Sequence, residues 1–253
     1  MKKRIIACLD CKDGKVIKGV NFENFRNVGD PVEAAKLYCE EGADTVVILD
    51  IAATLEGRKT FAELVKKVAE VVTVPFIVGG GMRSVEEVDA VMEAGADGIS
   101  INTAAVLNPD LINLVSEKYG KGKLTVAIDA GRSEDGSYIV YIKGGTERYN
   151  LDAVEWAKEV QRRGAGEILL TSRDADGVKN GYDIEMTRAV ADAVSIPVTA
   201  SGGAGKLSDF YDALTEGGAE AALAASLFHF RELTIGQVKE YLAGRGVEVY
   251  GEY

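Results

Sequence analysis

Two aspartates, Asp10 and Asp129, are the residues of this sequence best suited to chemistry. Each closes a short apolar run, IIACL before Asp10 and LTVAI before Asp129, and each is followed by a segment that reads as a loop. In a barrel of parallel strands, carboxylates at the strand ends supply the proton donors and acceptors of catalysis. One protonated and one ionised carboxyl would serve as general acid and general base. The pair predicts acid–base chemistry at one mouth of a barrel.

Eight short apolar runs predict the strands that would position these carboxylates. Each run is nearly continuous in apolar residues, which is typical of strands buried on both faces. The runs cover residues 4–10, 45–50, 75–79, 98–102, 124–129, 167–171, 197–201 and 221–225. Amphipathic stretches lie between them. This order predicts one α/β domain over residues 1–253, a closed (β/α)8 TIM barrel of eight strands and eight helices.

Start and stop signals bound the predicted helices. Capping-box spacings predict helix starts at Asp30 with Glu33, Thr60 with Glu63, Ser84 with Glu87 and Thr234 with Gln237. Glycines where helices should end are Gly42, Gly95, Gly120, Gly164, Gly217 and Gly244. Two segments lack a helical period. We expect Cys11 to Gly29, with Lys18 and Phe22, to form a long lid or binding loop, and Gly131 to Thr146 to form a small hairpin.

The two halves of the chain resemble each other. ADTVVILDIAATLEG (43–57) resembles AGEILLTSRDADGVK (165–179), and VPFIVGGGM (74–82) resembles IPVTASGGA (196–204). The offsets are close to the 119 residues that separate Asp10 from Asp129. Two half-barrels, about residues 1–122 and 123–253, explain this period. A doubly wound sheet, the main alternative, does not.

Glycine-rich turns after the third and seventh strands predict two anion sites. Backbone N–H groups there are unshielded by side chains and can approach an oxyanion closely, and the following strands end in polar residues at the start of a short helix. These residues are Gly79, Gly80, Gly81, Gly202 and Gly203, with Asn102, Thr103, Ala225 and Ser226 after them. Two facing anion sites predict an elongated substrate with a phosphate at each end. Further polar residues expected at the same mouth are Asp50, Thr171, Ser172 and Ser201.

Composition excludes several classes of partner. The net charge of −11 argues against nucleic acid, because a broad phosphate-binding surface needs excess positive charge. No apolar run approaches the length of a membrane span, and MKKRIIACLD enters a strand without a signal pattern, so we expect no membrane contact and a cytoplasmic location. Cys8 and Cys11 should lie on opposite faces of a strand, which argues against a redox or metal pair. For His229, the only histidine, we expect a packing or capping role at the start of the last helix.

From Arg4 to about Tyr241 the chain resembles the cyclase subunit of imidazole glycerol phosphate synthase, of histidine biosynthesis. The segments that carry this resemblance include IIACLD, KDGKVIKGVNFEN, VGGGMRS, SINTAAV, GAGEILLTS, DADGVKNGYD, ASGGAGK and ALAASLFHFRE. The resemblance implies that the ribulosyl bisphosphate PRFAR and ammonia give imidazole glycerol phosphate and the carboxamide ribotide AICAR, a lyase reaction. It implies neither a cofactor nor a metal.

The resemblance also implies roles for individual residues. Asp10 and Asp129 resemble the catalytic base and acid, and Lys18 the cation of a mobile loop. It places one phosphate at Gly81, Asn102 and Thr103 and the other at Asp176, Gly177, Gly203 and Ser226, with the centre of the substrate lined by Thr171 and Ser201. From their positions at strand ends and glycine turns, we expect Asp50, Gly80, Gly202 and Ala225 to join these substrate-binding residues.

The family works with a glutaminase subunit at the opposite, N-terminal mouth, and ammonia enters past a ring of Arg, Glu, Lys and Glu. This resemblance implies a heterodimer. Arg4 and Glu167 match the ring, whereas Thr45 and Gly98 replace its other two charges. We therefore expect ammonia entrance to be ungated or gated differently.

The sequence allows two other interpretations of its function. The sister isomerase, which acts on the preceding bisphosphate, shares the half-barrel plan, but its first strand resembles PAIDL and it lacks the NFEN loop. A non-catalytic barrel would keep the packing alone, and the intact pair Asp10 and Asp129 argues against it.

Overall fold

Eight parallel strands close into a barrel in the described part of the chain, which confirms the predicted (β/α)8 TIM barrel. The computed structural model describes residues 2–12, 15–20, 23–50 and 55–251. The strand order around the ring is β10-β11-β12-β1-β4-β5-β6-β7, and pairing of β7 with β10 closes it. The barrel strands are β1 (Arg4–Lys12), β4 (Thr45–Asp50), β5 (Phe76–Gly80), β6 (Gly98–Ile101), β7 (Leu124–Arg132), β10 (Glu167–Ser172), β11 (Val198–Ser201) and β12 (Ala221–Ala224).

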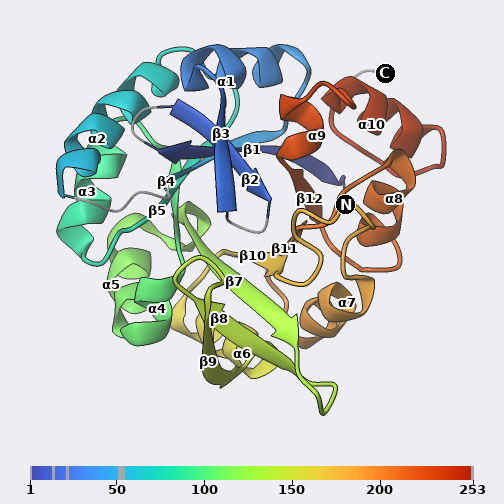
Figure 1. Ribbon diagram of the computed structural model, residues 1–253. Coiled ribbons are helices and arrows are strands. Elements are labelled where there is room, and N and C mark those ends of the chain that lie inside the picture. Colours follow the sequence, from blue (N-terminus) through green and yellow to red (C-terminus); the bar gives the residue numbers. More distant parts are fainter. Residues whose placement is uncertain (1, 13–14, 21–22, 51–54, 252–253) are drawn as a thin grey trace.

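Helices form a ring outside the strands (Figure 1). Seven helices connect successive barrel strands in the described part of the chain, namely α1 (Pro31–Glu40), α2 (Leu55–Ala69), α3 (Val85–Glu93), α5 (Asp110–Tyr119), α6 (Ala153–Arg163), α7 (Ile184–Ala193) and α8 (Leu207–Leu214). An eighth, α10 (Ile235–Ala243), follows the last strand, β12. Three shorter helices are α4 (Thr103–Leu107), η1 (Lys121–Lys123) and α9 (Ser226–His229). The helices α4 and α9 directly follow strands β6 and β12, where the sequence predicts short helices.

Most predicted helix starts are confirmed by their caps. The Asp30 carboxylate accepts from the backbone of Val32 and Glu33, and Thr234 and Gln237 form a complete capping box. Thr60 is the exception, because it lies inside α2 and that prediction is wrong. The preceding LEGRK segment is rich in helix-forming residues, so the helix extends past the motif toward the N-terminus. The capping-box spacing alone could not show this.

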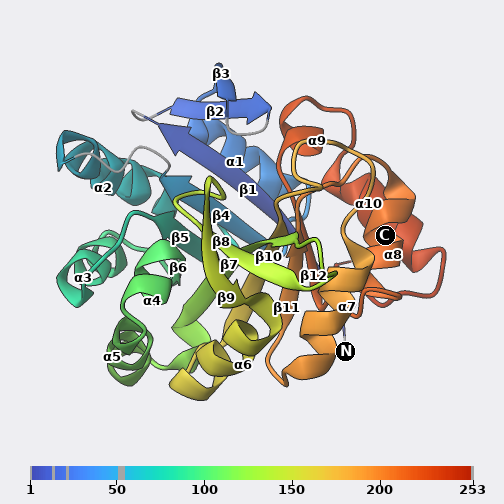
Figure 2. The same ribbon diagram turned by 60° about the horizontal axis from the view of Figure 1, so that its bottom comes forward.

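Two antiparallel additions extend the barrel. The segment after Cys11, predicted as a long loop, instead continues β1 and adds β2 (Lys15–Val20) and β3 (Glu23–Gly29), which pair with each other. Lys18 lies in β2, whereas Phe22 lies outside the described residues. The hairpin predicted after the fifth strand is larger than expected. Strand β7 continues to Arg132 and pairs with β8 (Tyr138–Ile142), which pairs with β9 (Glu147–Asp152) (Figure 2).

The core has two parts. The larger cluster packs the outward-facing side chains of the strands against the helices, and Cys11 belongs to it. A smaller cluster, with Ile6, Cys8, Val47, Leu169 and Leu223, fills the inside of the barrel. The predicted placement of Cys8 and Cys11 on opposite faces is therefore confirmed. Within the described ranges, no helix is both long and apolar enough to cross a membrane.

Candidate active site

Asp10 and Asp129 lie on opposite sides of one mouth of the barrel. Their strands, β1 and β7, are four strands apart in either direction around the ring. Asp10 continues the inward-facing series of Ile6 and Cys8, and Asp129 follows Ala127 in the same way. Both lie near the carboxyl ends of their strands. The two carboxylates therefore face the same space from opposite walls.

The surroundings of Asp129 raise the pKa of its carboxyl. Burial raises its pKa to about 6 from the ordinary 3.8, and the negative charge of Asp176 adds to this, while a hydrogen bond from Asn102 opposes it. That bond runs from Asn102 Nδ2 to Asp129 Oδ2 at 2.9 Å. A carboxyl with such a pKa can exist as an acid near neutral pH. Asp129 is thus suited to give a proton.

Two glycine turns bring backbone close to the mouth. Gly80 has φ of 107°, and a Cβ there would lie 2.2 Å from the carbonyl oxygen of Asp50. Gly203 has φ of 106°, and a Cβ would lie 2.1 Å from the carbonyl oxygen of Gly181. Any side chain at either position would collide with backbone. Both turns therefore require glycine.

The short helices α4 and α9 begin in similar ways at facing positions. Asn102, before α4, has φ and ψ of −129° and −96°, and Ala225, before α9, has −121° and −70°. Thr103 and Ser226 are the first helical residues. The Thr103 hydroxyl accepts a hydrogen bond of 2.8 Å from the backbone of Lys143, which ties the β8–β9 turn to this side. Asn102 Oδ1 is buried and has no hydrogen-bond partner among the described residues.

The other predicted mouth residues also follow the ends of barrel strands. Asp50 ends β4, Ser201 ends β11, and Thr171 pairs in register with Asp129. Asp176 lies in the loop after β10, where its backbone N–H donates to Ser172. The remaining residues of this set are Gly81, with φ of 33°, Gly177, with φ of 77°, and Gly202, with φ of 85°. The structure thus brings the set together at one end of the barrel.

The residues predicted at the ammonia entrance lie at the opposite end of the barrel. Arg4 donates to Glu167 at 2.8 Å, and the Thr199 hydroxyl donates to the same carboxylate oxygen. Thr45 is buried, and its hydroxyl donates to the carbonyl of Asp44 at 2.8 Å. A Cβ on Gly98 would lie 3.1 Å from the carbonyl oxygen of Lys123. The Arg4–Glu167 ion pair and the Thr45 hydroxyl therefore both lie at this end of the barrel.

Three hydroxyl residues that the sequence did not single out, Ser100, Thr125 and Thr199, face the inside of the barrel beside Glu167. All three interrupt apolar runs as single hydroxyl residues. The sequence signal for them is a hydroxyl residue between apolar neighbours. Which face of the sheet such a residue lies on follows only from the strand register.

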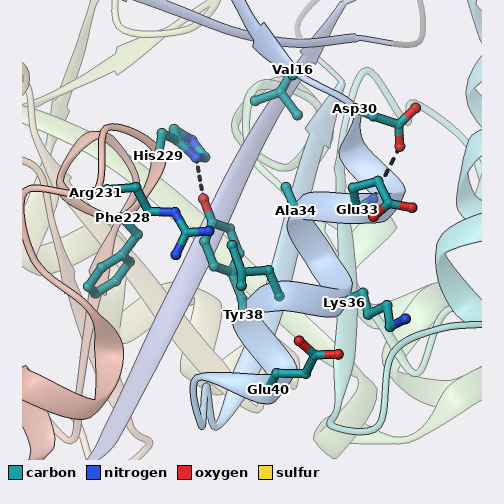
Figure 3. A pocket seen from close by; sticks show the side chains of 12 residues that line it. Val16, Asp30, Glu33, Ala34, Lys36, Tyr38, Glu40, Phe228, His229 and Arg231 are labelled. Atoms are coloured by element: carbon teal, nitrogen blue, oxygen red, sulfur yellow. Dashed lines mark hydrogen bonds between the residues drawn. The ribbon is translucent and has the colours of Figure 1, made fainter.

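A cleft of about 400 Å³ on the flank of the barrel lies apart from the mouth (Figure 3). It runs between α1 and α9, and none of the predicted mouth residues lines it. Across it the hydroxyl of Tyr38 and Nδ1 of His229 are 2.5 Å apart. His229 thus packs against α1 as predicted, but it ends α9 rather than starting the last helix. Among the described residues, no group of three or more His, Cys, Asp or Glu side chains could hold a metal.

Comparison with known proteins identifies the family. The family model described as "Histidine biosynthesis protein" matches residues 4–234. A relative from Pyrobaculum aerophilum, named "Imidazole glycerol phosphate synthase subunit HisF", is 58% identical over 248 residues, which cover 97% of each chain. Relatives of the same name from Geobacillus kaustophilus and Bacillus licheniformis are 55% and 53% identical over 98% of each chain. The chain belongs to this HisF family of histidine biosynthesis. Its resemblance to the imidazole glycerol phosphate synthase barrel is confirmed, and it is an enzyme of that biosynthesis.

Proposed function

We propose that this protein is a lyase that closes an imidazole ring, converting PRFAR and ammonia into imidazole glycerol phosphate and AICAR. The observation that carries the proposal is the pair Asp10 and Asp129, opposed across one mouth of the barrel. Membership of the HisF family supports this choice of substrate. We expect the reaction to take place in the cytoplasm, without a cofactor or metal.

In this reaction Asp129 acts as the general acid and Asp10 as the general base. The raised pKa of Asp129 favours a protonated carboxyl, and Asn102 fixes its orientation through Asp129 Oδ2. Asp10, on the facing wall, takes a proton from the reacting centre. Catalysis by such groups is worth on the order of 100- to 10,000-fold in rate. The role of Asn102 is to position Asp129.

The two phosphates of the substrate bind at the two glycine turns. One site uses Gly80, Gly81, Asn102 and Thr103, and the other uses Asp176, Gly177, Gly202, Gly203, Ala225 and Ser226. Backbone N–H groups at the starts of α4 and α9 would donate to the phosphate oxygens. Lys18 adds a cation, while Asp50, Thr171 and Ser201 line the centre. This arrangement corresponds to the two half-barrels, about 1–122 and 123–253.

Ammonia reaches the mouth from the opposite end of the barrel, where we propose that a glutaminase subunit docks to form a heterodimer. The word "subunit" in the names of the relatives supports a partner. Arg4, Thr45, Gly98 and Glu167 surround the entrance. With Thr45 and Gly98 in place of charges, this entrance is ungated or gated differently from that of the family. Equal glutamine-coupled turnover of the wild type and a Thr45→Glu/Gly98→Lys variant would contradict this.

The direct test of function is ultraviolet monitoring of PRFAR with an ammonium salt and no partner. The proposal predicts turnover by the isolated chain, because free ammonia replaces the glutaminase. The aldose precursor of PRFAR, the substrate of the sister isomerase, is the control compound. If the chain turned over the precursor but not PRFAR, the proposed function would be wrong and the chain would be assigned as the isomerase.

A further inference from the structure

The helix α9 is a single turn that begins at one of the two proposed phosphate sites and ends at His229. Ser226 is its first residue. The backbone N–H of His229 donates to the Ala225 carbonyl at 3.0 Å, which joins the two ends of the turn. A helix of one turn is not stable by itself in water, so its orientation depends on contacts with the rest of the barrel. A rotation at His229 would therefore also move Ser226.

One hydrogen bond joins the last residue of α9 to α1 (Figure 3). The hydroxyl of Tyr38 and Nδ1 of His229 are 2.5 Å apart. Tyr38 is 2% exposed and belongs to the larger core cluster, together with Ala35 of the same helix. The Asp30 carboxylate caps the start of α1. Because α1 is capped and packed into the core, it is a firm support to which Tyr38 connects α9.

Two other contacts hold α9 and the residues after it on the barrel, but neither is both buried and directional. The ring of Phe228 is 1% exposed, and its centroid lies 6.3 Å from that of Tyr38 and 6.2 Å from that of Phe210 in α8. Such apolar packing has no preferred direction. Arg231 pairs with Glu41, but its side chain is 57% exposed, and exposed ion pairs contribute little. The hydrogen bond between α1 and α9 is both buried and directional, so it can fix the rotation of α9.

The facing helix α4 has an apolar residue at the position that His229 occupies in α9. Thr103 begins α4 as Ser226 begins α9. Three positions after Thr103 the chain has Val106, which is buried, whereas three positions after Ser226 it has His229. The Thr103 hydroxyl instead accepts from the backbone of Lys143 in the β8–β9 turn. Different parts of the chain therefore support the two proposed phosphate sites.

We propose that Tyr38 and His229 are positioning residues, which orient α9 and thereby hold Ser226 in place at one of the two phosphate sites. The inference rests on the proposed function, because that function places a phosphate at Ser226. Both side chains line the cleft on the flank of the barrel rather than the mouth. They therefore act on binding of the substrate and not on the proton transfers of Asp10 and Asp129.

The first test removes the hydroxyl. Tyr38→Phe keeps the ring, and we expect KM for PRFAR in the ammonium assay to rise about three- to tenfold, as for the loss of one hydrogen bond, with kcat unchanged. A rise confined to KM means a loss of binding that substrate and transition state share, which a general weakening of the fold would not produce. Tyr119→Phe is the matched control. The Tyr119 hydroxyl donates to Asp89 between α5 and α3, so both constants should stay unchanged.

The second test replaces the imidazole. In His229→Asn the side-chain amide can place an oxygen or an NH2 group near the position of Nδ1, so KM should stay within about twofold of the wild type. His229→Leu has no polar atom there and should match Tyr38→Phe. The double variant Tyr38→Phe/His229→Leu should raise KM no further, because both changes remove the same hydrogen bond. Equal rises in His229→Asn and His229→Leu, or a wild-type KM in Tyr38→Phe, overturn the inference.

A titration with inorganic phosphate separates this inference from the proposed function. The backbone amide signals of Ser226 and Thr103 report on the two sites in one NMR experiment without PRFAR, and both should shift in the wild type. In Tyr38→Phe we expect the apparent Kd at Ser226 to rise about three- to tenfold and that at Thr103 to stay unchanged.

Three results of this titration overturn the inference: equal losses of affinity at Ser226 and Thr103, an unchanged Kd at Ser226, or no shift at Ser226 in the wild type. A wild type that binds phosphate at both sites but does not turn over PRFAR would instead reject the proposed function.

Discussion

The two ends of the barrel hold their ionisable groups differently. At the N-terminal end, Lys239 donates to Asp44 and Arg4 donates to Glu167. At the carboxyl-terminal end, the Asp129 carboxyl accepts a hydrogen bond from the Asn102 amide, and the nearby negative charge of Asp176 disfavours its ionised form. Opposite charges are neutralised at the first end. At the second, a carboxyl is kept in an environment that disfavours its charge. The difference shows where the chain uses ionisable groups for stability and where it keeps them for chemistry.

Removing a carboxylate at the mouth should produce the largest effect on activity. We expect Asp10→Asn and Asp129→Asn each to lower ammonium-supported turnover by on the order of 100- to 10,000-fold with the fold intact. Asp135→Asn is the matched control, because Asp135 is an exposed acid that accepts from Ser137 in the β7–β8 turn. Steady-state kinetics and circular dichroism check both points. Full activity in either variant would remove that residue from the mechanism.

At the N-terminal end the largest effect should be on stability. Lys239 is 1% exposed and donates to Asp44 at 2.5 Å and to the Tyr250 carbonyl at 3.0 Å, while Asp44 also accepts from the backbone of Ile5. Lys239→Met leaves a buried carboxylate without its cation, which should cost about 3–5 kcal/mol of unfolding free energy.

Lys158→Met is the control for that measurement. Lys158 pairs with Glu155 on the surface of α6, where both side chains are well exposed, and such pairs contribute at most about 1 kcal/mol. Urea unfolding monitored by fluorescence measures both variants. Equal losses would mean that burial does not distinguish the two ion pairs.

A smaller effect should be a pH dependence of the unfolding free energy that comes from Asp129 at the mouth. The pKa of Asp129 is about 6 in the folded chain against 3.8 for an ordinary Asp, so the folded state binds more protons between these values. Stability should therefore fall as pH rises from about 4 to 6, by at most about 3 kcal/mol. Asp129→Asn removes this contribution. Its unfolding free energy should match that of the wild type near pH 4 and exceed it at pH 8; a difference that is the same at both values would contradict the raised pKa.

The sequence was sufficient to predict the barrel because its strands are nearly continuous apolar runs with helices between them. It also placed Asp10 and Asp129 at one mouth, since both end such runs. The β2–β3 pair was not predicted, because the glycines at 14, 19 and 29 read as loop residues, whereas strand pairing there depends on the extension of β1 past Cys11.

Other parts of the site depend on contacts that no local pattern contains. The pKa of Asp129 results from its burial and from Asn102 and Asp176, which lie 27 and 47 positions away in sequence. The inward hydroxyls of Ser100, Thr125 and Thr199 each interrupt an apolar run as a single polar residue. Only the register of β6, β7 and β11 brings them to one cavity.

The most direct test of joint action by the two carboxylates is turnover of PRFAR with ammonium salt by Asp10→Asn, Asp129→Asn and the double variant. If acid and base act on one reacting centre, the double variant should be little slower than the worse single variant, because either loss already disables the pair. Losses that multiply in the double variant would show that the two residues act independently and would contradict the account.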